Sequence, residues 1–79
     1  MSNSDKIPKI GQKILVHNPD DISRDDYDVK ASDIAKVVYV INEYAIIAYN
    51  PQWNNREWIT PRGNWSGVVI WAEEYKVIE

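Results

Sequence analysis

The stretch AKVVYVINEYAIIAY, residues 35–49, limits the possible folds more than any other part of this sequence. Its β-branched and aromatic residues favour strands. The polar pair Asn42-Glu43 predicts a two-residue turn, so we expect a β-hairpin with strands at residues 35–41 and 44–49. Both strands carry apolar residues on both faces. Such strands suit a closed barrel or a tight sandwich better than an open sheet with one solvated face.

Four more short segments have the composition of strands and are separated by turn-forming residues. They lie at residues 12–17, 57–60, 67–71 and 75–78, and in the first of them Ile14 and Val16 fall on one face. The tripeptide Ala72-Glu73-Glu74 predicts one helical turn before the last of them. The sequence therefore predicts an all-β fold of five to six short antiparallel strands. Residues 1–9 are polar and are expected to form a flexible tail, followed by one domain over residues 10–79.

Residues 18–33 form a long acidic segment after the first predicted strand. Asn18, Pro19 and the aspartates behind them resemble a helix start, with an asparagine cap, a proline in the first position and acids in the first turn. Apolar residues are too sparse here to continue a helix, so we expect one helical turn at most inside a long loop. The acids lack the alternating spacing and central glycine of a calcium-binding loop, which argues against a metal site.

The composition narrows the class of protein further. The chain has 79 residues and no cysteine, so neither a disulfide nor a thiolate zinc site stabilises it, and a small core must draw on its aromatic residues. The net charge of −3 argues against broad electrostatic binding to nucleic acid, which needs a basic face. No apolar run reaches the length of a secretion signal or a membrane span, so we expect a cytoplasmic protein that crosses no membrane.

Residues 50–65, NPQWNNREWITPRGNW, place three tryptophans among turn-forming residues. Trp58 falls in a predicted strand and Trp71 in a later apolar run, so both are expected in the core. Trp53 and Trp65 fall in predicted loops and are expected to be partly exposed. An exposed tryptophan is the kind of residue that forms a binding hot spot.

The order of these elements and the length of the first loop resemble the Src-homology-3 (SH3)-like barrel over residues 10–79. In SH3 domains, acids of the first long loop lie beside an aromatic groove that holds a proline-rich peptide. By this resemblance, the partner-binding residues would be Asp25, Asp26 and Asp28 in the acidic loop, with Trp53, Tyr75 and Trp65 in the groove. The Ala-Leu-Tyr-Asp-Tyr signature of SH3 domains is absent, as are their paired tryptophan and the proline before the final tyrosine, which argues against a proline-rich ligand. The alternative fold is a five-stranded barrel of the oligonucleotide-binding type.

These features predict a small non-enzymatic protein-binding module, a regulator or inhibitor that docks on a larger protein through the loop aromatics and the acidic loop. Small phage- or plasmid-borne proteins are often built in this way. His17 is the one histidine, and no nucleophile, phosphate-binding or metal-ligand motif occurs in the sequence. We therefore expect no enzyme, with no catalytic residue, no cofactor and no metal.

Three alternatives stay open at the level of sequence. Arg56 and Arg62 stand among Trp53 and Trp65, and guanidinium groups beside indole rings bind nucleic acid by stacking and by holding phosphate. The acidic face could instead mimic nucleic acid and occupy a DNA-binding enzyme, as a phage-type inhibitor would. Residues 35–49 could self-associate through an unprotected strand edge, so we expect a monomer or a weak homo-oligomer.

Overall fold

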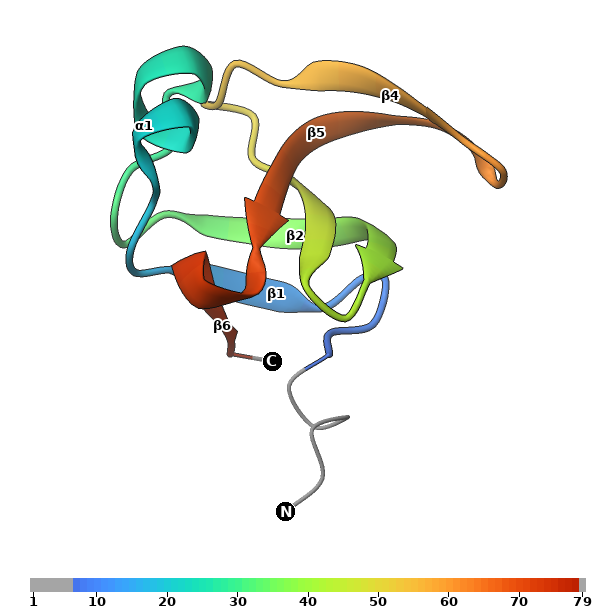
Figure 1. The fold of residues 1–79 in the computed structure, drawn as a ribbon, viewed down its shortest axis with the longest axis horizontal. Helices are drawn as coiled ribbons and strands as arrows, with labels where there is room; N and C mark the ends of the chain where they lie inside the picture. Colours follow the sequence, from blue (N-terminus) through green and yellow to red (C-terminus); the bar gives the residue numbers. More distant parts are fainter. Residues whose placement is uncertain (1–6, 79) are drawn as a thin grey trace.

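The computed structural model describes residues 7–78, so most of the tail predicted at residues 1–9 lies outside the described residues. The elements follow in the order β1 (Lys13–Val16), α1 (Asp21–Tyr27), β2 (Ile34–Asn42), β3 (Ala45–Tyr49), β4 (Arg56–Thr60), β5 (Gly63–Trp71), η2 (Ala72–Glu74) and β6 (Tyr75–Val77) (Figure 1). The six strands form one antiparallel sheet, and η2 is a 3-10 turn directly before the last strand. The predicted all-β class and the short helical turn are thus confirmed.

In space the strands follow the order β4-β5-β3-β2-β1-β6. The β2–β3 hairpin lies in the middle, because β2 also pairs with β1 and β3 also pairs with β5. β3 is paired with β5 over residues 45–48, whereas β1 pairs with β2 only at residues 34–36, so the later part of β2 has no strand partner on the β1 side. The last strand returns to the first, with Val16 opposite Tyr75.

One face of the sheet carries the core. Alternation along the strands, together with residues from two loops, brings together Ile14, Val16, Val29, Ala35, Val37, Ile46, Ala48, Trp53, Val68, Ile70 and Tyr75. Ile14 and Val16 are both fully buried, which confirms the face predicted for the first strand. Val29, in the loop after α1, and Tyr27 of α1 also pack against this face, so α1 lies on the core side of the sheet.

The β2–β3 hairpin turns one residue later than the sequence predicted. Asn42 belongs to β2, and residues 43–44 form the turn. The Asn42 side chain accepts hydrogen bonds from the backbone N–H groups of Tyr44 (2.7 Å) and Ala45 (3.0 Å). Asparagine forms turns in this way because its short side chain reaches the backbone two residues further on.

The acidic segment contains a longer helix than predicted. α1 has seven residues, and its N-cap is Asp20, whose side chain accepts a hydrogen bond from the N–H of Ser23 (2.8 Å). The predicted cap at Asn18 and the predicted limit of one turn are therefore wrong. Asp28 ends the helix in the left-handed conformation, with φ of 63°. Ser23 is buried, so tertiary packing stabilises a helix that its local sequence alone would not sustain.

β4 and β5 form a hairpin, and we call its residues 56–66 the arm. Pro61 and Arg62 form its turn, and β5 begins at Gly63, whose φ is 117°. Trp65 therefore lies in a strand and not in the loop predicted from the sequence. Figure 1 shows the arm extending away from β1 and β2, with its turn and α1 at opposite ends of the long axis of the molecule.

Gly67 marks the point where β5 leaves the arm and joins β3. Figure 1 shows that β5 bends strongly along its length. A Cβ atom at Gly67 would lie 2.5 Å from the carbonyl oxygen of Ala48 and 2.9 Å from Cγ2 of Ile47. Only glycine allows the two strands to approach so closely, and this approach sets the position of the arm.

Candidate functional site

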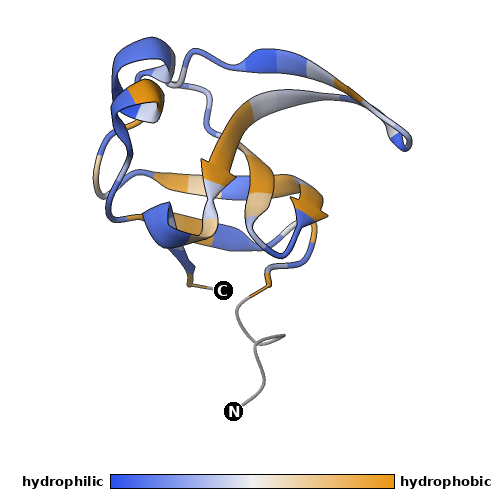
Figure 2. Ribbon diagram, viewed as in Figure 1, coloured by the Kyte–Doolittle hydropathy of each residue, from blue (hydrophilic) through white to orange (hydrophobic). Residues whose placement is uncertain are grey.

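The sheet has a second apolar face, on the side away from the core, which we call the open face. Strand register places Tyr39, Ile47 and Val69 side by side on it, and Ala45 lies opposite Trp71. Figure 2 shows that hydrophobic residues are concentrated in the central strands, whereas α1 and η2 are mostly hydrophilic. α1 packs on the core side and does not cover this face. Ile47 (1% exposed) and Ala45 (3% exposed) are nevertheless buried, Tyr39 and Val69 are half-buried, and Trp71 is exposed.

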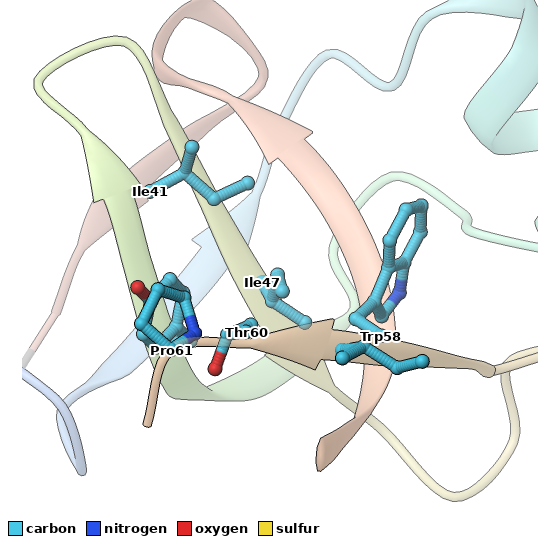
Figure 3. Close-up of a pocket in the computed structure, with 7 residues that line it drawn as sticks. Ile41, Ile47, Trp58, Thr60 and Pro61 are labelled. Carbon is cyan, nitrogen blue, oxygen red and sulfur yellow. The ribbon is translucent and has the colours of Figure 1, made fainter. Parts of the chain in front are cut away.

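The arm and the β2–β3 hairpin enclose a groove on the open face. The groove has a volume of about 260 Å³ and is lined by Tyr39, Ile41, Ile47, Trp58, Ile59, Thr60 and Pro61. Figure 3 shows Trp58 at one end, Ile41 and Pro61 at the other, and Ile47 between them. This volume is below the usual range of about 300–1,000 Å³ for small-molecule sites. The groove is therefore suited to one or two side chains or bases of a larger partner.

Hydrogen bonds fix the aromatic side chains of the arm. Trp58 Nε1 donates to the carbonyl oxygen of Gly67 (2.9 Å), and Trp65 Nε1 donates to Oγ1 of Thr60 (3.2 Å). The Thr60 hydroxyl donates in turn to the carbonyl oxygen of Gly63 (2.7 Å) across the turn. Trp58 and Trp65 lie directly opposite each other in the register. The groove thus has one wall in which the Trp58 ring is held in a defined position.

Two of the three aromatic residues predicted to form a surface groove lie in the core. Trp53 is 5% exposed, and its Nε1 donates a hydrogen bond to Oδ2 of Asp33 (2.7 Å). The prediction that Trp53 is partly exposed is wrong, because its loop folds inward and Asp33, directly before β2, provides an acceptor for the indole N–H. Tyr75 is also buried, and burial raises the pKa of its phenol above the ordinary value. Trp65 is half-buried on the arm, so the three rings do not form one surface.

Trp71 was expected in the core but is 46% exposed. That prediction is wrong, because Trp71 alternates with the buried Ile70 and therefore lies on the open face. Trp58, the other ring expected in the core, is half-buried in the groove wall. The aromatic residues at the surface are therefore not the ones that fall in the predicted loops.

The predicted acidic residues are all exposed at one end of the molecule. Asp25 and Asp26 lie in α1, and Asp28 is its C-cap. Arg24 bridges Asp25 (3.2 Å) and Asp21 (2.9 Å), and these hydrogen bonds, the one to Asp25 above all, raise the pKa of Arg24. The loop of Trp53 lies beside α1, because the backbone N–H of Asn54 donates to the carbonyl oxygen of Tyr27 (2.8 Å), but Trp53 itself is buried in the core.

The two arginines of the nucleic-acid alternative lie at opposite ends of the arm. The Arg56 guanidinium donates a hydrogen bond to the hydroxyl of Tyr27 (3.1 Å) and lies 6.0 Å from the centre of its ring. This hydrogen bond is the main cause of the raised pKa of Arg56. Arg62 is exposed in the arm turn. Arg56 and Trp65 share one side of the arm, whereas Trp53 is separated from them in the core.

Sequence reasoning missed the residues of the open face, namely Tyr39, Ile41, Tyr49 and Trp71. The signal was present, because both faces of residues 35–49 were recognised as apolar. A pattern that is apolar on both faces does not say which face the rest of the chain covers.

Within residues 7–78, no group of three or more His, Asp or Glu side chains is placed to hold a metal ion. None of the described helices is long and apolar enough to cross a membrane. Comparison of the chain with protein-family models, with curated proteins and with solved structures found no match. Its function must therefore be argued from the geometry of the open face.

Proposed function

We propose that this protein is a non-enzymatic binding module that docks on a larger macromolecule through the open face of its sheet, as a regulator or inhibitor of that partner. The fold assigned to it is an SH3-like barrel. A strand order in which β6, β1, β2, β3 and β5 are successive neighbours, with a 3-10 turn before β6, supports this assignment. The arm is then an extension of the hairpin that leads into β5.

The observation that carries the proposal is the apolar surface around the groove. Ile59, on the groove rim, is 86% exposed, and Ile41 and Trp71 on the open face are also exposed. Clustered apolar side chains of this kind mark interaction sites, whereas single exposed ones need no explanation. Large aromatic residues beside such a pocket are typical hot spots.

The acidic end of the molecule supports docking less well than the open face. Arg24 pairs with Asp21 and Asp25, which lowers the net negative charge of α1. A mimic of nucleic acid needs a dense and unpaired array of charges, so we place the docking surface on the open face instead.

An affinity capture from lysate of the native host tests the docking face. The wild-type protein is compared with Trp71→Ala on the open face and Ile59→Ala on the groove rim. Ile22→Ala is the matched control, because Ile22 is an equally apolar and exposed residue of α1. Each variant is first shown to be folded, and each capture is run with and without nuclease.

We expect one partner that wild type and Ile22→Ala retain and that both Trp71→Ala and Ile59→Ala lose. Equal retention by all four proteins would place the docking surface elsewhere. A wild-type protein that captures no specific partner would contradict the proposed function itself.

A further inference from the structure

The strands without a neighbour on one side differ in how well their edges are protected. β6 and β4 end the sheet, and the later part of β2 has no strand partner on the β1 side. An open edge pairs with another chain unless it is very short, irregular, charged or covered. β6 has only three residues, and two register shifts interrupt β2, between Val37 and Tyr39 and between Val40 and Asn42. β4 keeps an unbroken register over five residues, so its edge is the most regular of the three.

The hairpin register shows which backbone groups β4 presents on its outer side. The two-residue turn of the arm is closed by Thr60 and Gly63, and such a closing pair exchanges hydrogen bonds. Opposite pairs alternate between bonded and non-bonded, so Trp58 is the next residue of β4 that bonds to β5. The N–H and C=O groups of Glu57 and Ile59 therefore point away from β5. In the described part of the chain, no backbone group on their outer side bonds to either of them.

The side chains of β4 do not protect this edge. β4 contains no lysine, proline or bulge, and its second half, Trp58-Ile59-Thr60, carries no charge. Ile59 is 86% exposed, more than any other large hydrophobic residue in the described part of the chain. On the other side of the arm, β3 occupies the edge of β5 from Val68 onward, so an added strand would run into the end of β3. Figure 1 shows β4 along the outside of the arm, away from the rest of the sheet.

We propose that two copies of this protein associate by antiparallel pairing of β4 with β4, around a two-fold axis beside Trp58. Trp58 then lies opposite Trp58 of the second copy, and Glu57 lies opposite Ile59, so all the outward N–H and C=O groups of Glu57 and Ile59 are bonded. A register centred on Glu57 would place two carboxylates opposite each other. A register centred on Ile59 would pair Glu57 with Pro61, which has no N–H to donate. The edge that self-associates is thus β4 and not residues 35–49.

Charge complementarity supports a second copy as the chain that covers this edge. The same register, continued beyond β4, places Arg62 in the arm turn of one copy opposite Asn54 of the other. Asn54 is bonded to the end of α1, through its N–H to the carbonyl oxygen of Tyr27 (2.8 Å) and through its side-chain amide to that of Asp26 (3.0 Å). The exposed Arg62 of each copy is therefore brought to the exposed carboxylates of Asp26 and Asp28 of the other. The two-fold axis makes this contact twice.

This pairing joins the grooves of the two copies. Trp58 lines the groove of each copy, and the two Trp58 residues are direct neighbours across the axis. They form a non-bonded pair, in which Cα atoms of opposite residues are about 4.5 Å apart, so the two side chains share one face of the joined sheet. The two grooves thus become one longer surface. The inference goes beyond the docking proposed above and does not rest on it, because it concerns the pairing of this chain with itself.

Sedimentation equilibrium of the purified protein at several concentrations tests the inference. The paired edge is short, so we expect a reversible dimer whose fraction rises with protein concentration up to about 1 mM. Ile59→Glu should leave the protein monomeric, because it places a second carboxylate opposite Glu57 of the other copy. Ile78→Glu is the matched control, since it makes the same change at an exposed isoleucine beside β6, at the far edge of the sheet. This control should dimerise as wild type does.

Two further changes test the register. Glu57→Lys added to Ile59→Glu gives opposite charges at residues 57 and 59 across the axis and should restore the dimer. Arg62→Glu should weaken the dimer by about fivefold or more, because two contacts with α1 become repulsive. Lys76→Glu makes the same reversal on the exposed surface of β6 and should change the dissociation constant by less than about twofold.

Circular dichroism first establishes that each variant is folded, so that loss of the dimer is not loss of the fold. A wild-type protein that stays monomeric up to about 1 mM would overturn the inference. Equal dimerisation of wild type and Ile59→Glu would overturn it as well, because the edge of β4 would then lie outside the interface. Equal loss of the dimer in Ile59→Glu and Ile78→Glu would attribute the loss to net charge and not to β4. A folded double variant that stays monomeric would overturn the pairing of Glu57 with Ile59.

Discussion

The Glu74 carboxylate accepts a hydrogen bond from the backbone N–H of Asp20 (2.9 Å), across 54 positions of the chain. Its second oxygen accepts from the N–H of Trp71 (2.8 Å). Glu74 is 2% exposed, so the acceptor in both bonds is shielded from water. One buried side chain therefore joins the start of α1 to the end of β5.

Replacement of Glu74 by alanine should destabilise the protein by about 2–4 kcal/mol, because two backbone N–H groups lose a charged acceptor. Glu74→Gln should cost less, since the amide oxygen still accepts one bond. Denaturant unfolding measures both values, with the exposed Glu73→Ala as the control. An unchanged midpoint for Glu74→Ala would show that water replaces the carboxylate and that the link carries no stability.

Trp53 and Trp71 should respond oppositely to quenching of fluorescence by iodide. Trp53 lies in the core, bonded to Asp33, whereas Trp71 is exposed on the open face. The quenchable component should therefore disappear in Trp71→Phe and persist in Trp53→Phe. Trp53→Phe should also cost about 1.5–3 kcal/mol of stability, because it removes a hydrogen bond to a carboxylate. Loss of the quenchable component in Trp53→Phe instead would contradict the assignment of faces.

The strands of Ile14 and Trp71 show where prediction from the sequence succeeds and where it fails. The alternation of Ile14 and Val16 identified a buried face, because every second residue of a strand points the same way. For Trp71 the alternation was equally regular, but both faces of the central strands are apolar. Which face is covered depends on where α1 and the loops pack, and no local pattern contains that information.

The predicted start of α1 was wrong for a related reason. Asn18 is as good a cap as Asp20 by residue type. What selects Asp20 is the bond from its N–H to Glu74, a partner far away in the sequence. Local propensity found a helix start in the right segment, and a tertiary contact fixed its position and length.

Stability at alkaline pH should depend on Tyr75. Its phenol loses a proton near about pH 10 in the unfolded chain, and burial raises the pKa in the folded chain. The stabilisation is therefore fully present below about pH 10 and is lost as the pH rises through the folded pKa. Tyr75→Phe should lose less stability than wild type between about pH 8 and about pH 11, measured by urea unfolding. Equal losses would indicate that Tyr75 is solvated in the folded protein.

Reversal of the Lys36 charge should make the fold slightly more stable. Lys36→Glu places a carboxylate opposite Lys13 and replaces a pair of like charges by an attractive one. The expected gain is about 0.2–1 kcal/mol at low salt, and it should shrink as salt is added. Thermal unfolding at two salt concentrations measures it, with Lys36→Gln as the control that removes repulsion alone. A destabilised Lys36→Glu would show that the lysine packs favourably in this position.

Alanine at Gly67 should displace the arm. Its Cβ atom would overlap the carbonyl oxygen of Ala48 and Cγ2 of Ile47, and the backbone oxygen has no room to move without breaking the β3–β5 pairing. We expect a loss of about 1–3 kcal/mol and a more exposed Trp58, because the groove opens when β5 moves away from β3. Chemical unfolding measures the loss of stability, and amide exchange of residues 56–66 reports the displacement of the arm. Ser66→Ala, one residue earlier on an exposed position, should leave both unchanged. A Gly67→Ala protein with wild-type stability and exchange would mean that the arm is not held by this close approach.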